Sequence, residues 1–217
     1  MHSPDGKKRG GADAASLGGP LVMQVVSVKI KLQPTKLDMT EAAIAFEVSI
    51  KDAEELLSRF DAENDSPSEY NSEALKRAGL VMAMAAWETY VKDRFNEEFS
   101  VWLRAVEGSQ VGKFVKKKKE EDLKRFFNPN SEKTRRLFLE YFEVDITQSW
   151  KWANYDSIDA KKTLDSLVSK RGDAAHKAKT NSKKNFETHL VKREELEKAI
   201  RFLKGLVSAT EKFKITK

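Results

Sequence analysis

The stretch GLVMAMAAWETYV, residues 79–91, lies in the middle of a longer segment, 72–102, that contains no proline and predicts one continuous helix. Its residues are apolar on nearly every helical face, and a helix of that kind is usually buried on most of its sides. We therefore expect this segment to be the central helix of the fold. The longest apolar run, 78–87, is far shorter than the roughly 20 residues that cross a membrane, so no membrane partner is expected.

Amphipathic helices are predicted on both sides of this segment. Upstream, Thr40 is a good N-cap for a helix that ends near residue 62. Downstream, the apolar spacing indicates helices at 113–127, at 132–143, from Asp156 or Ser157 through Val168 into RGDAAH, and at 193–213. In the 113–127 helix the predicted inner side chains are Phe114, Val115, Leu123, Phe126 and Phe127. The predicted fold class is all-α, a helical bundle of five or six helices.

The N-terminal region is expected to lie outside this bundle. Residues 1–22 are Gly-rich and have no apolar period, so we expect a disordered leader or tail. Residues 23–39 contain QVVSVKIKL, which is rich in β-branched residues and is followed by Pro34. We expect a short strand or an extended arm there, and one helical domain over residues 40–217.

Cysteine and charge content narrow the classes of function. The chain has no cysteine, which excludes disulfides, thiolate nucleophiles and thiolate zinc sites. Together with the lack of a visible signal peptide, this favours the cytoplasm. The net charge is +6, yet residues 113–136 and 170–193 each carry a local charge of +6. Two concentrated basic segments suggest a surface that faces a polyanion, although lysine-rich runs also occur as solvated helix faces.

The chain offers few residues for acid–base catalysis near neutral pH. Its three histidines are His2, which lies in the leader, His176, and His189, which we expect to be structural. The sequence contains no HExxH motif, no Gly-rich phosphate loop and no nucleophile elbow. No paired-ligand spacing supports a metal site, so neither a metal nor another cofactor is expected.

One segment stands out, KRGDAAHK at residues 170–177, in which Arg171 precedes His176 near a predicted helix end. Histidine titrates near neutrality and can serve as base or acid. Arginine stays charged and matches two phosphate oxygens with its planar fork. On an ideal helix, positions 171 and 176 lie about 140° apart. One helix therefore does not bring both side chains together unless the backbone breaks at Gly172 or the arginine folds round.

This segment resembles the Rx4–6H motif of the HEPN superfamily, and the resemblance extends over roughly residues 40–210. The stretch LKRAGLVMAMAAWETYVKDRF, 75–95, is similar to the long early HEPN helix that carries an acidic residue, here Glu88. The stretch LVKREELEKAIRFLKGLV, 190–207, is similar to the last helix of the RiboL-PSP type. The resemblance implies an HEPN-like helical bundle that pairs around a two-fold axis, with one motif from each subunit in a shared cleft.

Many members of this superfamily are metal-independent endoribonucleases in toxin–antitoxin, phage-defence or RNA-processing systems. The resemblance therefore implies RNA as the substrate, a homodimer and possible pairing with a protein antitoxin. It implies Arg171 and His176 as the catalytic pair. Asp173, one turn before His176, is expected to fix the imidazole tautomer, and Glu88 is expected to pair with Arg171 or with a lysine of another helix. The residues expected to bind RNA phosphates are Lys170, Lys177, Lys179, Lys116 and Lys117.

Two other interpretations stay open. Active HEPN proteins often carry a polar residue directly after the motif arginine, where this chain has Gly172. The second hypothesis is therefore a catalytically inactive HEPN module that binds RNA, a nucleotide or a protein partner. The third is a structural helical adaptor whose basic segments hold an acidic partner. In that case Arg171 is an ion-pair residue at a helix end, and His176 interacts only with the helix dipole.

Overall fold

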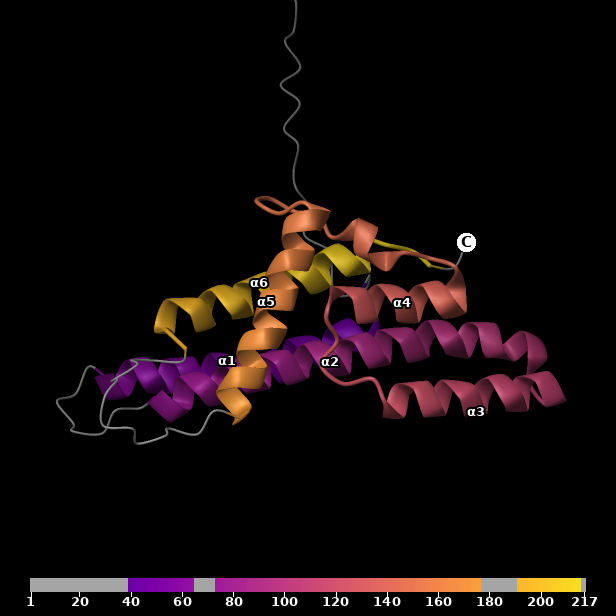
Figure 1. Cartoon of the computed structure of the whole chain (residues 1–217), viewed down its shortest axis with the longest axis horizontal. Coiled ribbons are helices and arrows are strands. Elements are labelled where there is room, and N and C mark those ends of the chain that lie inside the picture. Colours follow the sequence, from indigo (N-terminus) through magenta and orange to yellow (C-terminus); the bar gives the residue numbers. More distant parts are fainter. Residues whose placement is uncertain (1–38, 65–72, 177–190, 216–217) are drawn as a thin grey trace, which may run out of the picture. The chain divides into compact units, whose positions relative to one another are not determined.

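The computed structural model describes residues 39–64, 73–176 and 191–215. The predicted leader at 1–22 and residues 23–38 of the predicted arm lie outside this described part of the chain. The described residues form six α-helices (Figure 1): α1 Glu41–Asn64, α2 Glu73–Leu103, α3 Gln110–Lys124, α4 Ser131–Phe142, α5 Ser157–His176 and α6 Arg193–Glu211. Two short 3-10 helices, Arg104–Val106 and Ile146–Ser149, follow α2 and α4. The prediction of an all-α bundle is confirmed, and within these ranges the only β-pairing is one isolated bridge, Trp152 with Tyr155.

Helix α2 is the centre of the bundle, as its sequence predicts. Its Trp87 and Phe95 are fully buried, and α1, α5 and α6 all pack against it. The exposed residues of the quoted stretch are Met82, Ala85 and Thr89. These positions recur at intervals of three and four residues, so they share one helical face.

A glycine in the middle of this buried helix has a packing reason. A Cβ atom at Gly79 would lie 2.7 Å from Leu196 Cδ2 of α6. The missing side chain therefore lets α6 approach the backbone of α2 closely.

Helix α3 differs from its prediction. It begins at Gln110 and ends at Lys124, so Phe126 and Phe127 follow it. Phe126 is buried as expected, but Phe114 is 68 % exposed and Phe127 is 57 % exposed, so their predicted inward orientation is wrong. For Phe114 the physical reason is that, among the described elements, α3 packs against α2, so the other side of α3 stays open. Phe127 lies beyond the end of the helix, so the helical spacing does not set its direction.

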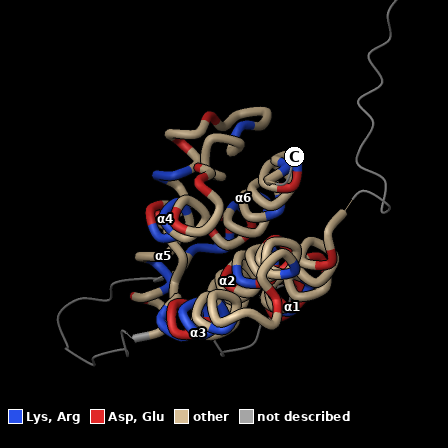
Figure 2. Tube along the Cα trace, turned by 90° about the vertical axis from the view of Figure 1, so that its right-hand side faces the viewer, with Lys and Arg blue, Asp and Glu red and all other residues tan. Residues whose placement is uncertain are grey.

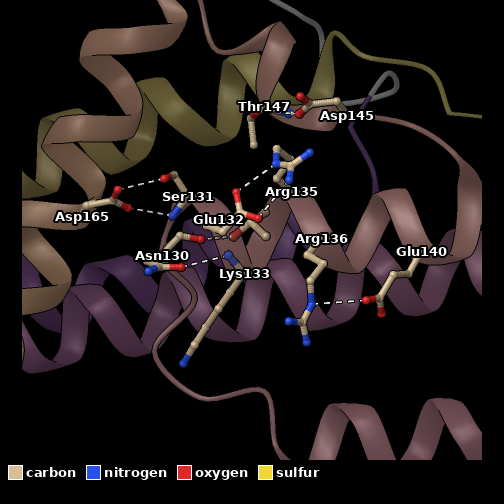
Figure 3. Close-up of polar contacts among 11 residues, drawn as sticks. Asn130, Ser131, Glu132, Lys133, Arg135, Arg136, Glu140, Asp145, Thr147 and Asp165 are labelled. Atoms are coloured by element: carbon tan, nitrogen blue, oxygen red, sulfur yellow. Dashed lines mark hydrogen bonds and ion pairs between the residues drawn. The ribbon is translucent and has the colours of Figure 1, made fainter.

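Polar contacts fix α5 to the rest of the bundle. Asp165 of α5 accepts hydrogen bonds from the backbone N and the Oγ of Ser131, both at 2.8 Å, at the start of α4 (Figure 3). Asn130 caps the same helix through the backbone N of Lys133. The backbone N–H groups in the first turn of a helix have no partner inside that helix. Asp165 accepts from one of them at the start of α4, and the same contact anchors α5 to α4. None of the helices in the described ranges combines the length and apolar content that crossing a membrane requires.

Candidate functional site

The Arg171–His176 motif occupies the last turns of α5. The helix continues through Gly172 without a break and has His176 as its final residue. Positions 171 and 176 therefore stay about 140° apart around the helix axis, and the backbone break at Gly172 is absent. The side chain of His176, together with Lys177 and Lys179, lies outside the described residues.

Arg171 presents a buried donor. The residue is half-buried, and its Nε is buried with no hydrogen-bond partner among the described residues. A buried N–H group without a partner is energetically unfavourable. An anion that accepts from this nitrogen would remove that cost, which is the property a phosphate-binding arginine needs.

Arg77 of α2 is a second arginine of the same kind, which the sequence analysis did not single out. Its Nε is also buried, and it has no hydrogen-bond partner in the described part of the chain. The adjacent Lys76 differs because it is paired with Glu73 at 2.6 Å and lies over the Phe60 ring. The available signal was the pair of basic residues at 76–77, just before the apolar stretch of the central helix.

Glu88 has a structural role instead of the predicted contact with Arg171. One of its oxygens accepts from Lys92 Nζ at 2.7 Å, and the other accepts from the backbone N of Asn128 at 2.9 Å. Asn128 has a φ of 50°, in the left-handed region, so this bond supports a strained turn between α3 and α4. The alternative prediction, a lysine from another helix, is also wrong, because the cation is Lys92 of the same helix, four residues on.

Lys170 is already engaged. Its Nζ donates to Glu195 Oε1 of α6 at 2.6 Å, and this bond lowers the pKa of the Glu195 carboxyl because it favours the charged form. The pair links α5 to α6 directly before Arg171. Lys170 therefore anchors α5 to α6, and Glu195 largely balances its charge.

Lys116 and Lys117 remain open to solvent on α3. Both are exposed and make no ion pair among the described residues, whereas the next two lysines contact Asp122 and Asn96. Figure 2 looks nearly down the axis of α3 and shows both Lys/Arg and Asp/Glu positions around it. Helix α3 lies along the C-terminal half of α2. Helix α5 packs beside Leu80, which lies in the N-terminal half of α2. The exposed lysines and the motif thus belong to different parts of the bundle.

Asp173 is half-buried on the same turn of α5 as the motif. Its spacing places it one turn before His176, as the sequence predicts. In the described part of the chain, no group of three or more His, Asp or Glu side chains is arranged to hold a metal ion.

The comparison with protein families gives a match over most of the chain. The family model described as RiboL-PSP-HEPN matches residues 48–213, which include most of α1 and all of the other five helices. Comparisons with curated proteins and with solved structures gave no match.

Proposed function

Because the chain belongs to the RiboL-PSP-HEPN family, we propose that it is a metal-independent endoribonuclease whose site forms between two copies. The observation that carries the proposal is the end of α5, where Arg171 has a buried Nε without a described partner and the helix ends at His176. The unbroken helix separates these two positions around its axis. Two copies related by a two-fold axis bring two arginines and two histidines to one cleft, which a single copy does not.

The proposed reaction is cleavage of RNA by its own 2′-hydroxyl group. One imidazole takes the proton of the 2′-hydroxyl while the 2′-oxygen bonds to phosphorus. The bond from phosphorus to the 5′-oxygen breaks, and the second imidazole, in its protonated form, gives that oxygen a proton. The products are a 2′,3′-cyclic phosphate and a free 5′-hydroxyl. Arg171 stabilises the extra negative charge on the phosphorane, and Asp173 orients the imidazole of His176.

The basic side chains have separate tasks in this proposal. The exposed Lys116 and Lys117 of α3 attract the RNA backbone, together with Lys177 and Lys179 near the motif. Lys170 contributes by holding α5 against Glu195. A prokaryotic toxin–antitoxin or phage-defence system, in the cytoplasm and with a protein antitoxin, is the setting that fits such an activity.

The decisive experiment is RNA cleavage by the purified full chain in the presence of EDTA. We expect His176→Ala to abolish cleavage and His189→Ala, the matched histidine control, to leave it unchanged. Mass spectrometry should find 2′,3′-cyclic phosphate ends, and analytical ultracentrifugation should find a dimer. Cleavage that survives in His176→Ala, or an active monomer, would contradict the proposal.

A second candidate function is a catalytically inactive HEPN module that binds RNA, a nucleotide or a protein. The observation that favours it is Gly172, which follows the motif arginine where active members of the superfamily often have a polar side chain. This candidate predicts RNA affinity that falls steeply with salt. It predicts no cleavage at all, so the same experiment separates the two functions.

A further inference from the structure

A cavity of about 360 Å³ lies between α5 and α6 and is closed on another side by the buried Leu80 of α2. Its volume is within the range of sites that hold small organic ligands, about 300–1,000 Å³. None of the roles described above uses this cavity. On α5 its lining begins at Lys162 and ends at Lys170, directly before Arg171.

One wall of the cavity is aromatic. Tyr155 and Phe202 both line it, and their rings meet edge to face with centroids 5.1 Å apart. Trp152 stacks on Tyr155 at 4.8 Å and thereby holds that ring in place. Phe202 is only 3 % exposed, so Tyr155, which is half-buried, provides the ring surface that a ligand can contact. A ring held in place in this way suits a flat heterocyclic ligand, because stacking needs no further ordering of the protein side.

The charges around the cavity favour an anion. Three lysines line it, and Lys170 is balanced by its ion pair with Glu195. Lys162 of α5 and Lys198 of α6 are exposed and make no ion pair among the described residues. The two helices thus each contribute one unbalanced cation beside a largely apolar interior.

We propose that this cavity binds one nucleotide, with the base against Tyr155 and the phosphate facing Lys162 and Lys198. A ligand with a flat ring and a negative charge uses both features, whereas a purely apolar ligand leaves the two cations without a partner. The hydroxyl groups of Thr163 and Ser166, which also line the cavity, provide hydrogen bonds for the sugar or the base.

This inference extends the proposed function and rests on it where the nucleotide is part of an RNA strand. Because the cavity ends one residue before Arg171, an RNA whose scissile phosphate meets the motif has a neighbouring nucleotide within reach of the cavity. The cavity then selects single-stranded RNA, since a base must leave its stack to enter. A free nucleotide has the same chemistry and is the other possible source.

The test measures binding separately from cleavage. The full chain is titrated against a fluorescent single-stranded oligoribonucleotide that carries 2′-O-methyl groups and resists cleavage. We expect Ser166→Trp, which fills the cavity, to weaken binding about tenfold, the size of one lost stacking contact. Lys162→Ala should reduce affinity severalfold and lower the salt dependence by about 0.7 in log–log slope. Lys161→Ala removes the adjacent lysine, which does not line the cavity, and should change neither quantity.

Competition identifies the ligand. Nucleoside monophosphates should displace the oligonucleotide from the wild-type chain at concentrations where inorganic phosphate does not. Equal displacement by phosphate alone, or affinities in Ser166→Trp and Lys162→Ala that match Lys161→Ala, would overturn the proposal. Lys162 is an exposed residue, so its variant folds even if the tryptophan variant does not.

The two proposals fail in different ways. If the wild-type chain cleaves RNA and the cavity variants bind and cleave equally well, the cavity inference falls and the nuclease stands. If no RNA is cleaved but binding drops in the cavity variants and not in Lys161→Ala, the nuclease falls and the nucleotide site stands.

Discussion

Two arginines in this bundle, Arg94 of α2 and Arg171 of α5, occupy opposite situations. The side chain of Arg94 is only 6 % exposed, and its guanidinium lies 2.6 Å from Glu98 and 3.5 Å from Glu211. Arg171 is half-buried, and its guanidinium makes no ion pair with a described residue. Both arginines have a buried Nε without a hydrogen-bond partner among the described residues, so they differ in the carboxylates that surround Arg94. The same side chain is therefore charge-balanced at the core and unbalanced at the motif.

The surroundings of Arg94 explain why it belongs to the fold. Glu211, at the end of α6, also accepts from Tyr90 Oη at 2.7 Å and from the backbone N of Thr40 at 3.1 Å. Burial and the neighbouring Glu211 carboxylate raise the pKa of Tyr90, so its hydroxyl stays a donor. The network joins α2, α6 and the start of α1. An arginine that is paired with carboxylates of the protein contributes to the stability of the fold. An arginine without such a pair can bind an anionic ligand.

The largest effect is expected for Arg94→Ala. This change leaves buried carboxylates without their cation and should lower the free energy of unfolding by about 3–5 kcal/mol. Urea denaturation followed by circular dichroism measures the loss. Arg201→Ala is the matched control, because Arg201 is exposed and its removal should change stability by no more than about 0.5 kcal/mol. Equal stability of the two variants would contradict the assignment of Arg94 to the core.

Arg171→Ala should show the reverse pattern. We expect kcat/KM for RNA to fall at least about 100-fold, or nearly 3 kcal/mol, because a charge that stabilises the phosphorane is lost. Stability should change by less than about 1 kcal/mol, since no described partner is left behind. Arg171→Lys should recover only part of the activity, because an ammonium lacks the two-pronged donor geometry. Unfolding comparable to that of Arg94→Ala would make Arg171 a structural residue.

Asp165→Ala tests how α5 is held in place. It removes both hydrogen bonds to Ser131 and should lower the free energy of unfolding by about 1–2 kcal/mol, the usual cost of a lost helix cap. Thermal denaturation measures this loss. Asp159→Ala, at an exposed position in the first turn of α5, is the control. If Asp165→Ala and Asp159→Ala have the same melting temperature, the contact with α4 does not anchor the motif helix.

The smallest effect is expected at Gly172. A Cβ atom there meets nothing within 4 Å and the position is helical, so Gly172→Ala should raise the free energy of unfolding by about 0.5–1 kcal/mol. Gly172→Asn fits the same open space and supplies the polar side chain that active HEPN proteins often have. An increase in cleavage by Gly172→Asn over Gly172→Ala would show that the glycine limits activity. A loss of stability in Gly172→Ala would show that the position is more crowded than its geometry indicates.

Sequence patterns predicted the helices better than they predicted the faces of those helices. The buried central helix and the amphipathic last helix follow from apolar spacing alone, because that spacing reflects how many sides a helix must bury. Phe114 and Phe127 were assigned inward from the amphipathic pattern of a helix over residues 113–127. Phe114 instead lies on an open side of α3, and Phe127 follows the end of that helix. Spacing shows that a helix has an apolar face, and it does not show whether another element covers that face.

Partners of charged residues can be predicted from sequence when both residues lie on one helix, and not when they lie on separate elements. The Glu88–Lys92 pair is readable from sequence because residues four apart meet on one helix. The bond from Asn128 to Glu88 joins positions 40 apart, and the Lys170–Glu195 pair joins positions 25 apart. Both depend on how separate helices pack, and no local rule predicts them.

By itself, then, the sequence determined the helical class, the place of α2 at the centre and the position of the Arg171–His176 motif at the end of a helix. Each of these follows from residues within a few turns of one another, where the helical repeat sets the geometry. Only the tertiary structure decided that Arg94 lies between two carboxylates, that Arg171 makes no ion pair with a described residue, and that a cavity opens between α5 and α6. These outcomes depend on contacts between distant segments, which exist only once the helices have packed together.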